Sequence, residues 1–183
     1  MNRIRKALGL LPAAFIYLMF CVIFWGFVFT RITDTDAAHK LTLYADAQVT
    51  DGVGLAVKIE ETAGEGIRLA QARAFDYAMF DGDQLRNADL FIIRADHLSD
   101  YRDWVAPLPE ALRSRGALWE EDGQALGLKI YSAQTHSGPA MRYVNYLSPH
   151  EPETDCYLCF GASSLHLADG EALNAAETVL SLP

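Results

Sequence analysis

Asp89–Ile93, with the sequence DLFII, decides the fold class of this chain of 183 residues. Four apolar residues follow one another without polar alternation, which is typical of a central parallel strand that is covered on both faces. Parallel neighbours in a sheet are joined by crossover connections that usually contain a helix. We therefore expect strands and helices to alternate on both sides of this segment.

The residues before this strand fit that alternation. The β-prone segment Leu41–Ala45 predicts a first strand, and apolar residues at helical spacing predict a helix over Gln48–Thr62. Glycines at 64 and 66 end this helix, and Ile67–Ala74 predicts a second strand. Short turns are expected over three further segments, Asp76–Phe80, Asp81–Asp83 and Gln84–Asn87.

The residues after the strand predict shorter elements and one longer helix. A short helix over Leu98–Trp104 is stopped by Pro107, and Asp122-Gly123 joins two strands. The C-terminal helix begins at Asp169 or Gly170 and runs to about Ser181. The remaining expected elements are a turn at Glu110–Arg115, strands at Leu118–Glu121, Ala125–Tyr131 and Tyr157–Phe160, and a short strand or turn near Met141–Tyr146.

This order predicts an α/β fold, with a single doubly wound, mainly parallel sheet and helices on both faces, formed by residues 41–183. Ligands of such sheets bind beyond the carboxyl ends of the strands. Polar side chains that follow the predicted strands are therefore the candidate ligand-binding residues, with Arg94 suited to an anionic group and Tyr44 to stacking. Solvated loop positions and helix caps are the alternative for the same residues. The full set is Tyr44, Asp46, Arg94, Asp96, His97 and Tyr131.

A second long apolar segment, Ala7–Thr30, contains no charged residue. A helix needs about 20 apolar residues to cross a bilayer, so this segment predicts a transmembrane signal-anchor helix. A basic cytoplasmic N-terminus at residues 1–6 precedes it, and a polar tether at residues 31–40 follows it. The residues expected to anchor the chain in lipid are Leu11, Phe15, Leu18, Phe20, Ile23, Trp25 and Phe27.

The charges that flank this segment predict its orientation. Three basic residues precede it and two follow it, so the positive-inside rule places the N-terminus in the cytoplasm and residues 41–183 outside the cell membrane. The alternative is a cleaved signal peptide, whose apolar core usually spans about 7–15 residues. The bulky sequence around Trp25 offers no small-residue cleavage site, and Phe20 argues against lipidation at Cys21. An uncleaved single-pass anchor is the favoured interpretation.

The residues after the anchor are acidic. They carry 12 of the 15 Lys and Arg residues and all 24 Asp and Glu residues. Such a surface repels nucleic acid and anionic lipid headgroups. We therefore expect the bilayer to be a partner through the apolar helix alone, and we expect no nucleic-acid partner.

No motif indicates catalysis, a metal or a cofactor. Cys156 and Cys159 have the C-x-x-C spacing of a redox pair, but their neighbours predict a strand, in which residues i and i+3 point to opposite faces and cannot bridge. The five histidines lack the spacing of a zinc protease. Asp81-Gly82-Asp83 begins like a calcium loop, but Leu85 stands where an oxygen ligand is needed.

Several stretches together resemble one family. They are KLTLYAD (40–46), FDYAMFDG (75–82), NADLFIIRADHLSDYRDWVAPLPEAL (87–112) and DGQALGLKIY (122–131), followed by CYLCFGASSLHL (156–167) and EALNAAETVLSL (171–182). The first four resemble the N-terminal lobe of extracellular solute-binding proteins of bacterial ABC importers. The last two resemble that family's return to its first lobe, a strand with an S-x-H turn and then an alanine-rich helix.

The resemblance implies one lobe of a periplasmic-binding-protein-like fold. Proteins of that family have two lobes, whereas about 25 residues separate Tyr131 from Tyr157 here, so we expect the second lobe to be missing. Its loss would expose apolar surface to a permease, another surface protein or a second copy of the chain. The sequence thus indicates a membrane-anchored, extracytoplasmic, non-enzymatic binding or interaction module. The alternatives are a small-ligand receptor of an ABC-type importer with an open half-cleft, and an extracytoplasmic enzyme or thiol protein that uses Cys156 and Cys159.

Overall fold

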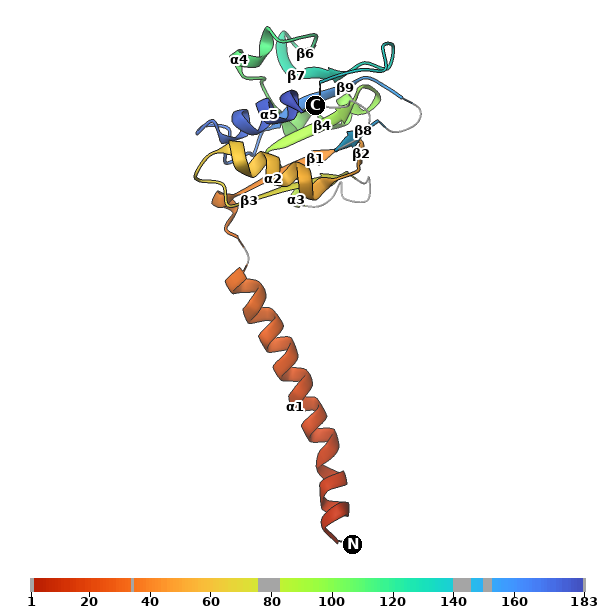
Figure 1. Ribbon diagram of the computed structural model, residues 1–183, viewed down its shortest axis with the longest axis vertical. Coiled ribbons are helices and arrows are strands. Elements are labelled where there is room, and N and C mark those ends of the chain that lie inside the picture. Colours follow the sequence, from red (N-terminus) through yellow and green to blue (C-terminus); the bar gives the residue numbers. More distant parts are fainter. Residues whose placement is uncertain (1, 34, 76–82, 140–145, 150–152, 183) are drawn as a thin grey trace. The chain divides into compact units, whose positions relative to one another are not determined.

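The computed structural model describes residues 2–33, 35–75, 83–139, 146–149 and 153–182 (Figure 1). The chain divides into two compact units, residues 1–35 and residues 36–183. The first unit consists of helix α1 (Asn2–Thr33), which includes the predicted helix at residues 7–30. Among the described residues, no helix meets the length and apolarity that a membrane crossing requires.

A mixed sheet forms the centre of the second unit. Its strands lie in the order β3 (Leu69–Ala74), β1 (Lys40–Ala45), β4 (Leu90–Arg94), β9 (Cys156–Gly161), β7 (Gln124–Tyr131) and β6 (Leu118–Glu121), and β5 (Val105–Ala106) pairs with β9. A separate two-stranded sheet joins β2 (Gln48–Val49) to β8 (Leu147–Ser148).

The prediction of a mainly parallel sheet is correct for one half of it. Strand β1 runs parallel to β3 and β4, as the predicted crossovers require. Strand β9 runs antiparallel to β4 and β7, and β6 runs antiparallel to β7. The β6–β7 hairpin turns at Asp122 and Gly123, both of which have positive φ, as the sequence predicted for this turn. The hairpin reverses the chain without a helical crossover and so makes β6 and β7 antiparallel, and β9 completes the antiparallel half of the sheet.

Two regular helices cover one face of the sheet (Figure 1). They are α2 (Gly52–Ala63) and α5 (Glu171–Ser181). Helix α2 begins four residues later than Gln48, where the sequence predicted its start, because the Asp51 side chain accepts a 2.8 Å hydrogen bond from the Gly54 backbone N–H and caps the helix. The short elements are η1 (Ala37–His39), α3 (Asp83–Arg86), η3 (Ala95–Trp104) and α4 (Glu110–Arg113).

The core lies on both sides of β4, as DLFII predicted. Leu90 and Ile92 pack in a cluster that includes the apolar side chains of α2 and α5. Phe91 and Ile93 pack in a second cluster with Tyr101 of η3. Helices on both faces are therefore confirmed, although the second face has short elements. The predicted helix Leu98–Trp104 is part of η3, a 3₁₀ helix.

Three expected features fall wholly or mostly outside the described residues. They are the turns at Asp76–Phe80 and Asp81–Asp83 and the strand or turn near Met141–Tyr146.

Candidate functional site

Four of the six predicted binding residues lie together at the carboxyl ends of β1 and β4. We call Asp46, Arg94, Asp96 and His97 the strand-end cluster. His97 Nδ1 lies 2.5 Å from Asp46 Oδ2, and the Arg94 guanidinium donates hydrogen bonds of 3.0 and 2.8 Å to the two carboxylate oxygens of Asp96. Partial burial raises the pKa of Asp96, but the hydrogen bond from Arg94 outweighs it and holds that pKa below its ordinary value. The Arg94 guanidinium is thus already paired with a carboxylate inside the cluster.

The other two predicted residues lie apart from this cluster. Tyr44 is buried in the hydrophobic cluster that contains Phe91. Tyr131 donates a 2.6 Å hydrogen bond from its hydroxyl to Glu153 Oε2. The six residues thus do not form one continuous site, and their binding role stays a prediction.

A cavity of about 470 Å³ lies on the face of the sheet formed by β1 and β3. Its floor is made by Thr42 and Tyr44 of β1 and by Gln71 and Arg73 of β3. These four side chains share a face because Thr42 pairs with Gln71 and Tyr44 with Arg73 in the parallel register. Residues from 37–40, 87–89 and 163–166 complete the wall. We call this hollow the β1–β3 cavity.

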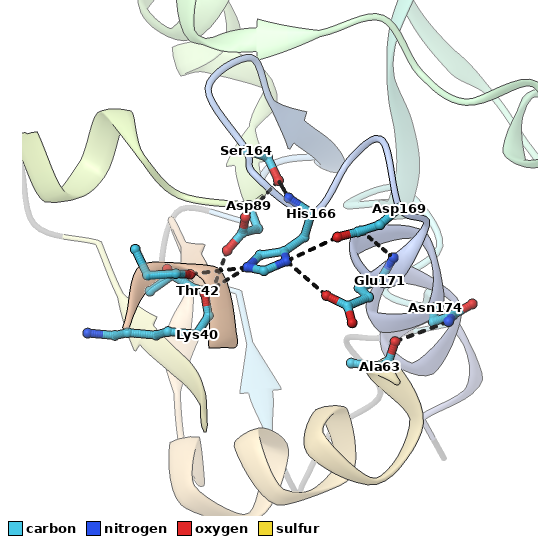
Figure 2. A network of polar contacts seen from close by, with 10 residues as sticks. Lys40, Thr42, Ala63, Asp89, Ser164, His166, Asp169, Glu171 and Asn174 are labelled. Atoms are coloured by element: carbon cyan, nitrogen blue, oxygen red, sulfur yellow. Dashed lines mark hydrogen bonds and ion pairs between the residues drawn. The ribbon is translucent and has the colours of Figure 1, made fainter. Parts of the chain in front are cut away.

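Two cationic side chains line the β1–β3 cavity. Within the described part of the chain, neither Lys40 nor Arg73 forms an ion pair, whereas Arg94 is paired with Asp96 and Lys129 with Asp155. Figure 2 shows the Lys40 side chain extending away from the neighbouring polar network. A cation without a carboxylate partner is available to a carboxylate or phosphate group of a ligand.

A buried carboxylate holds one wall of the cavity in place (Figure 2). Asp89 precedes β4 and is 2% exposed, and its oxygens accept hydrogen bonds of 2.7 Å from the Thr42 backbone N–H and 2.6 Å from Ser164 Oγ. Burial raises the pKa of Asp89, and these hydrogen bonds offset that effect only in part. Asp89 thus joins β1, the start of β4 and the loop after β9.

The imidazole of His166 lies next to this carboxylate (Figure 2). It is 2% exposed, and its Nε2 lies 3.2 Å from the Lys40 carbonyl oxygen and 3.3 Å from that of Ala37. Its Nδ1 lies 2.9 Å from Glu171 Oε2. Burial lowers the pKa of His166, but the charge of Asp89 and the neighbouring acceptors outweigh it and raise that pKa.

Asp89, Ser164 and His166 are the residue types of a catalytic triad, but their contacts differ from those of a triad. Ser164 Oγ donates to Asp89 and accepts from the His166 backbone N–H at 3.1 Å. No hydrogen bond joins Ser164 Oγ to the imidazole within the described region, so the histidine has no path to the hydroxyl proton. This network is a structural support of the cavity.

The two cysteines of the C-x-x-C motif lie on opposite faces of β9, as the sequence predicted. Cys156 belongs to the cluster that contains α2 and α5, and Cys159 to the cluster that contains Tyr101. Both thiols are free and buried. Burial raises the pKa of Cys156 to about 12 and raises that of Cys159 as well. This burial favours structural cysteines, because the reactive form of cysteine is the thiolate, and the thiol alternative stays a prediction.

Several residues of the cavity were not predicted as site residues. Lys40 and Arg73 lie within strands rather than after them, so strand ends alone do not identify them. The S-x-H turn at residues 164–166 is part of the family resemblance, and it is a sequence signal that lies at the cavity wall.

The second unit is therefore a mixed α/β domain with a polar, partly cationic cavity on one face of its sheet. No known family profile matches the sequence, and no curated protein matches it. Among solved structures, thiaminase I from Bacillus thiaminolyticus is similar, with 15% sequence identity and a TM-score of 0.35. The similarity covers 50% of this chain and 28% of that chain.

Proposed function

We propose that this chain is a membrane-anchored, extracytoplasmic binding module that holds a small anionic molecule in the β1–β3 cavity without catalysing a reaction. In this proposal, residues 7–30 are the anchor and residues 36–183 are a single lobe related to solute-binding proteins. The observation that carries the proposal is the presence of Lys40 and Arg73 in one cavity without a carboxylate partner among the described residues.

The cavity suits a small molecule in size and chemistry. Its volume of about 470 Å³ lies within the range of small-molecule sites, which is about 300–1,000 Å³. Its lining combines the two cations with the side chains of Thr42, Tyr44 and Gln71. A ligand with one or two carboxylate or phosphate groups on a compact polar body matches this lining. Because the rest of the domain is strongly acidic, an anion gains most in the cavity that these two cations line.

The order of the parallel strands supports the proposed relation to solute-binding lobes. The sheet runs β3–β1–β4, so the chain leaves β1 toward one side and later returns to its other side. Ligands of open α/β sheets bind where the strand order reverses, which is the location of the strand-end cluster. That cluster is the alternative place for the ligand, but its guanidinium, that of Arg94, is already paired with Asp96.

A ligand screen on the full chain in detergent micelles tests the proposal and separates the two places. The probes are small dicarboxylates, phosphomonoesters and acidic amino acids, and the readout is thermal unfolding. A ligand present at 100 times its dissociation constant stabilises the folded state by about 2.7 kcal/mol, which is about 5–10 °C for a domain of this size. We expect Arg73→Gln to abolish the shift and the matched variant Arg94→Gln to leave it unchanged.

A shift that Arg94→Gln abolishes and Arg73→Gln leaves unchanged would indicate that the ligand binds at the strand-end cluster instead. A shift that both variants keep, or the lack of a shift with every probe, would contradict the proposed function.

The anchor has its own test. A C-terminal fusion to a reporter that works only outside the cytoplasm should be active, and a fusion to a reporter that works only in the cytoplasm should be silent. Activity of the cytoplasmic reporter would reverse the proposed orientation.

One observation favours self-association as a second function. Strand β3 is an edge strand of the described sheet, and beside it lies a groove lined by Val53 and Val57, which are 78% and 46% exposed. Two copies that pair β3 with β3 around a two-fold axis would form one continuous sheet and cover both grooves. Sedimentation of the full chain in detergent tests this: Val57→Asp should shift a dimer to monomer, whereas Ala111→Asp on exposed α4 should not. A monomeric parent chain would exclude it.

A further inference from the structure

Three possible ligand atoms converge at the start of α5, outside the cavity floor (Figure 2). His166 Nδ1 lies 2.9 Å from Glu171 Oε2 and 3.6 Å from Asp169 Oδ2, and the three atoms all lie within 4.8 Å of one another. The imidazole is almost fully buried, the Glu171 side chain is 16% exposed and the Asp169 side chain is 49% exposed. The group is thus fixed at its inner end and open to solvent at its outer end.

The contacts of the other ring nitrogen determine which atom of His166 is available. Nε2 lies 3.2 and 3.3 Å from the carbonyl oxygens of Lys40 and Ala37, and a carbonyl oxygen can only accept. Nε2 therefore carries a hydrogen, and in the neutral imidazole the lone pair is on Nδ1. Two carboxylates lie beside that lone pair, so three acceptor groups face one another, and a proton or a metal ion between them would be stabilised.

A proton on Nδ1 satisfies this arrangement only in part. It would form a hydrogen bond to Glu171 at 2.9 Å, whereas Asp169 Oδ2 at 3.6 Å lies beyond hydrogen-bonding distance. A metal ion placed between them would be shared by all three atoms. Ligand atoms about 2.0–2.2 Å from a tetrahedral zinc ion lie about 3.3–3.6 Å from one another. The 3.6 Å separation from Asp169 Oδ2 to His166 Nδ1 fits this range, and the 2.9 Å separation from Glu171 Oε2 would have to widen slightly to admit the ion. We propose that His166, Asp169 and Glu171 bind a divalent transition-metal ion of the zinc type.

The surroundings support a built site. A histidine that ligates a metal usually donates its other N–H to a carbonyl or carboxylate, as Nε2 does here. Asp169 Oδ1 accepts the Glu171 backbone N–H at 3.1 Å, which orients the carboxylate and leaves Oδ2 for the ion. A side chain at Gly66 would place its Cβ 2.2 Å from Glu171 Oε1, so this glycine makes room for the Glu171 carboxylate.

The ligand set also selects the kind of ion. One imidazole with two carboxylates suits zinc or a similar first-row ion, whereas calcium and magnesium prefer sites made of oxygen ligands alone. The ion would join residues 37–40, which follow α1, to the start of α5 through the His166 ring. This inference involves neither the side chain of Lys40 nor that of Arg73 and goes beyond the proposed function, so either can fail without the other.

Zinc titration of the full chain, purified in detergent and freed of metal with a chelator, tests the site. We expect one equivalent of zinc to bind and calcium not to compete with it. With ¹⁵N-labelled histidine, the Nδ1 resonance of His166 should shift while the other four imidazoles keep theirs. Asp169→Asn keeps the oxygen that caps α5 and removes one charged ligand, so it should weaken zinc binding at least about tenfold. Asp103→Asn, at an exposed position of η3, is the matched control and should leave binding unchanged.

Glu171→Gln is the second ligand variant and keeps the proposal testable if Asp169→Asn does not fold. The proposal is overturned if zinc fails to bind stoichiometrically, if both ligand variants bind zinc as tightly as the parent, or if the shifted resonance belongs to another histidine. An imidazolium signal of His166 that zinc leaves unchanged would show that a proton fills this position, and would also overturn it.

Discussion

Replacing Asp89 by alanine is expected to lower the free energy of unfolding of the α/β unit by about 2–4 kcal/mol. The carboxylate accepts two hydrogen bonds, from the Thr42 backbone N–H at 2.7 Å and from Ser164 Oγ at 2.6 Å. Hydrogen bonds to a charged group contribute about 1.5–3 kcal/mol each. Burial raises the pKa of Asp89, which means that part of this gain is offset by the cost of desolvating the charge.

Asparagine at the same position should cost far less, about 1 kcal/mol or below. Its side-chain oxygen can accept the Thr42 N–H, and its amide can donate to Ser164 Oγ, because a hydroxyl can both donate and accept. Both contacts survive with one of them reversed, and the cost of burying a charge disappears. The difference between the two variants therefore separates the loss of hydrogen bonds from the loss of charge.

Thermal and urea unfolding of the full chain in detergent, followed by near-ultraviolet circular dichroism, measures both variants. For a domain of about 150 residues, 2–4 kcal/mol corresponds to a decrease in Tm of about 5–15 °C. Asp89→Ala should show that decrease, and Asp89→Asn should remain within a few degrees of the parent. Equal losses for the two variants, or an alanine variant as stable as the parent, would refute the role given to the carboxylate.

Three further predictions concern other parts of the domain. Gly127→Ala places a Cβ 2.7 Å from Cys159 Sγ and should cost about 1–3 kcal/mol in urea unfolding; adding Cys159→Ala should restore part of the loss, and strictly additive losses would contradict the contact. Cys156 and Cys159 should gain no iodoacetamide mass in the native chain at neutral pH and should react in urea, because burial raises both thiol pKa values. Asp155→Asn should cost about 1 kcal/mol at pH 7, where Lys129 lies 2.6 Å from Asp155. The Lys129 hydrogen bond lowers the pKa of Asp155, so this difference should vanish in urea titrations as the pH falls below about 3.8, and a difference that persists at lower pH would argue against the ion pair.

The fold could be predicted from the sequence where a local pattern is compatible with only one local structure. DLFII predicts a strand buried on both faces, and its side chains do alternate between two hydrophobic clusters. Asp122-Gly123 predicts a hairpin turn, and both residues have positive φ there. The direction of Cys156–Gly161 was not predictable, because an apolar strand reads the same whether its neighbour is parallel or antiparallel.

Only part of the candidate site could be predicted from the sequence. Asp46 and Arg94 follow strands that the sequence identifies, so their proximity could be expected from the rule for carboxyl ends. Arg73 and Lys40 line the same cavity through the register that pairs Arg73 with Tyr44 and Lys40 with Leu69, four positions apart. Hydrophobic pattern restricts such a register to alternate positions but does not choose among them.

The β1–β3 cavity and the strand-end cluster differ in whether their arginine already has a carboxylate partner among the described residues. Arg94 has a favourable location at the carboxyl edge of the sheet, yet its guanidinium is held by Asp96, and a ligand anion would have to replace that carboxylate. Arg73 has a less expected location, but a ligand anion there displaces no carboxylate of the described chain. Because a displaced partner subtracts its own interaction from the gain, equal contacts yield tighter binding at Arg73 than at Arg94. The comparison of Arg73→Gln with Arg94→Gln therefore measures whether the uncompensated charge or the strand-end rule decides where this fold binds.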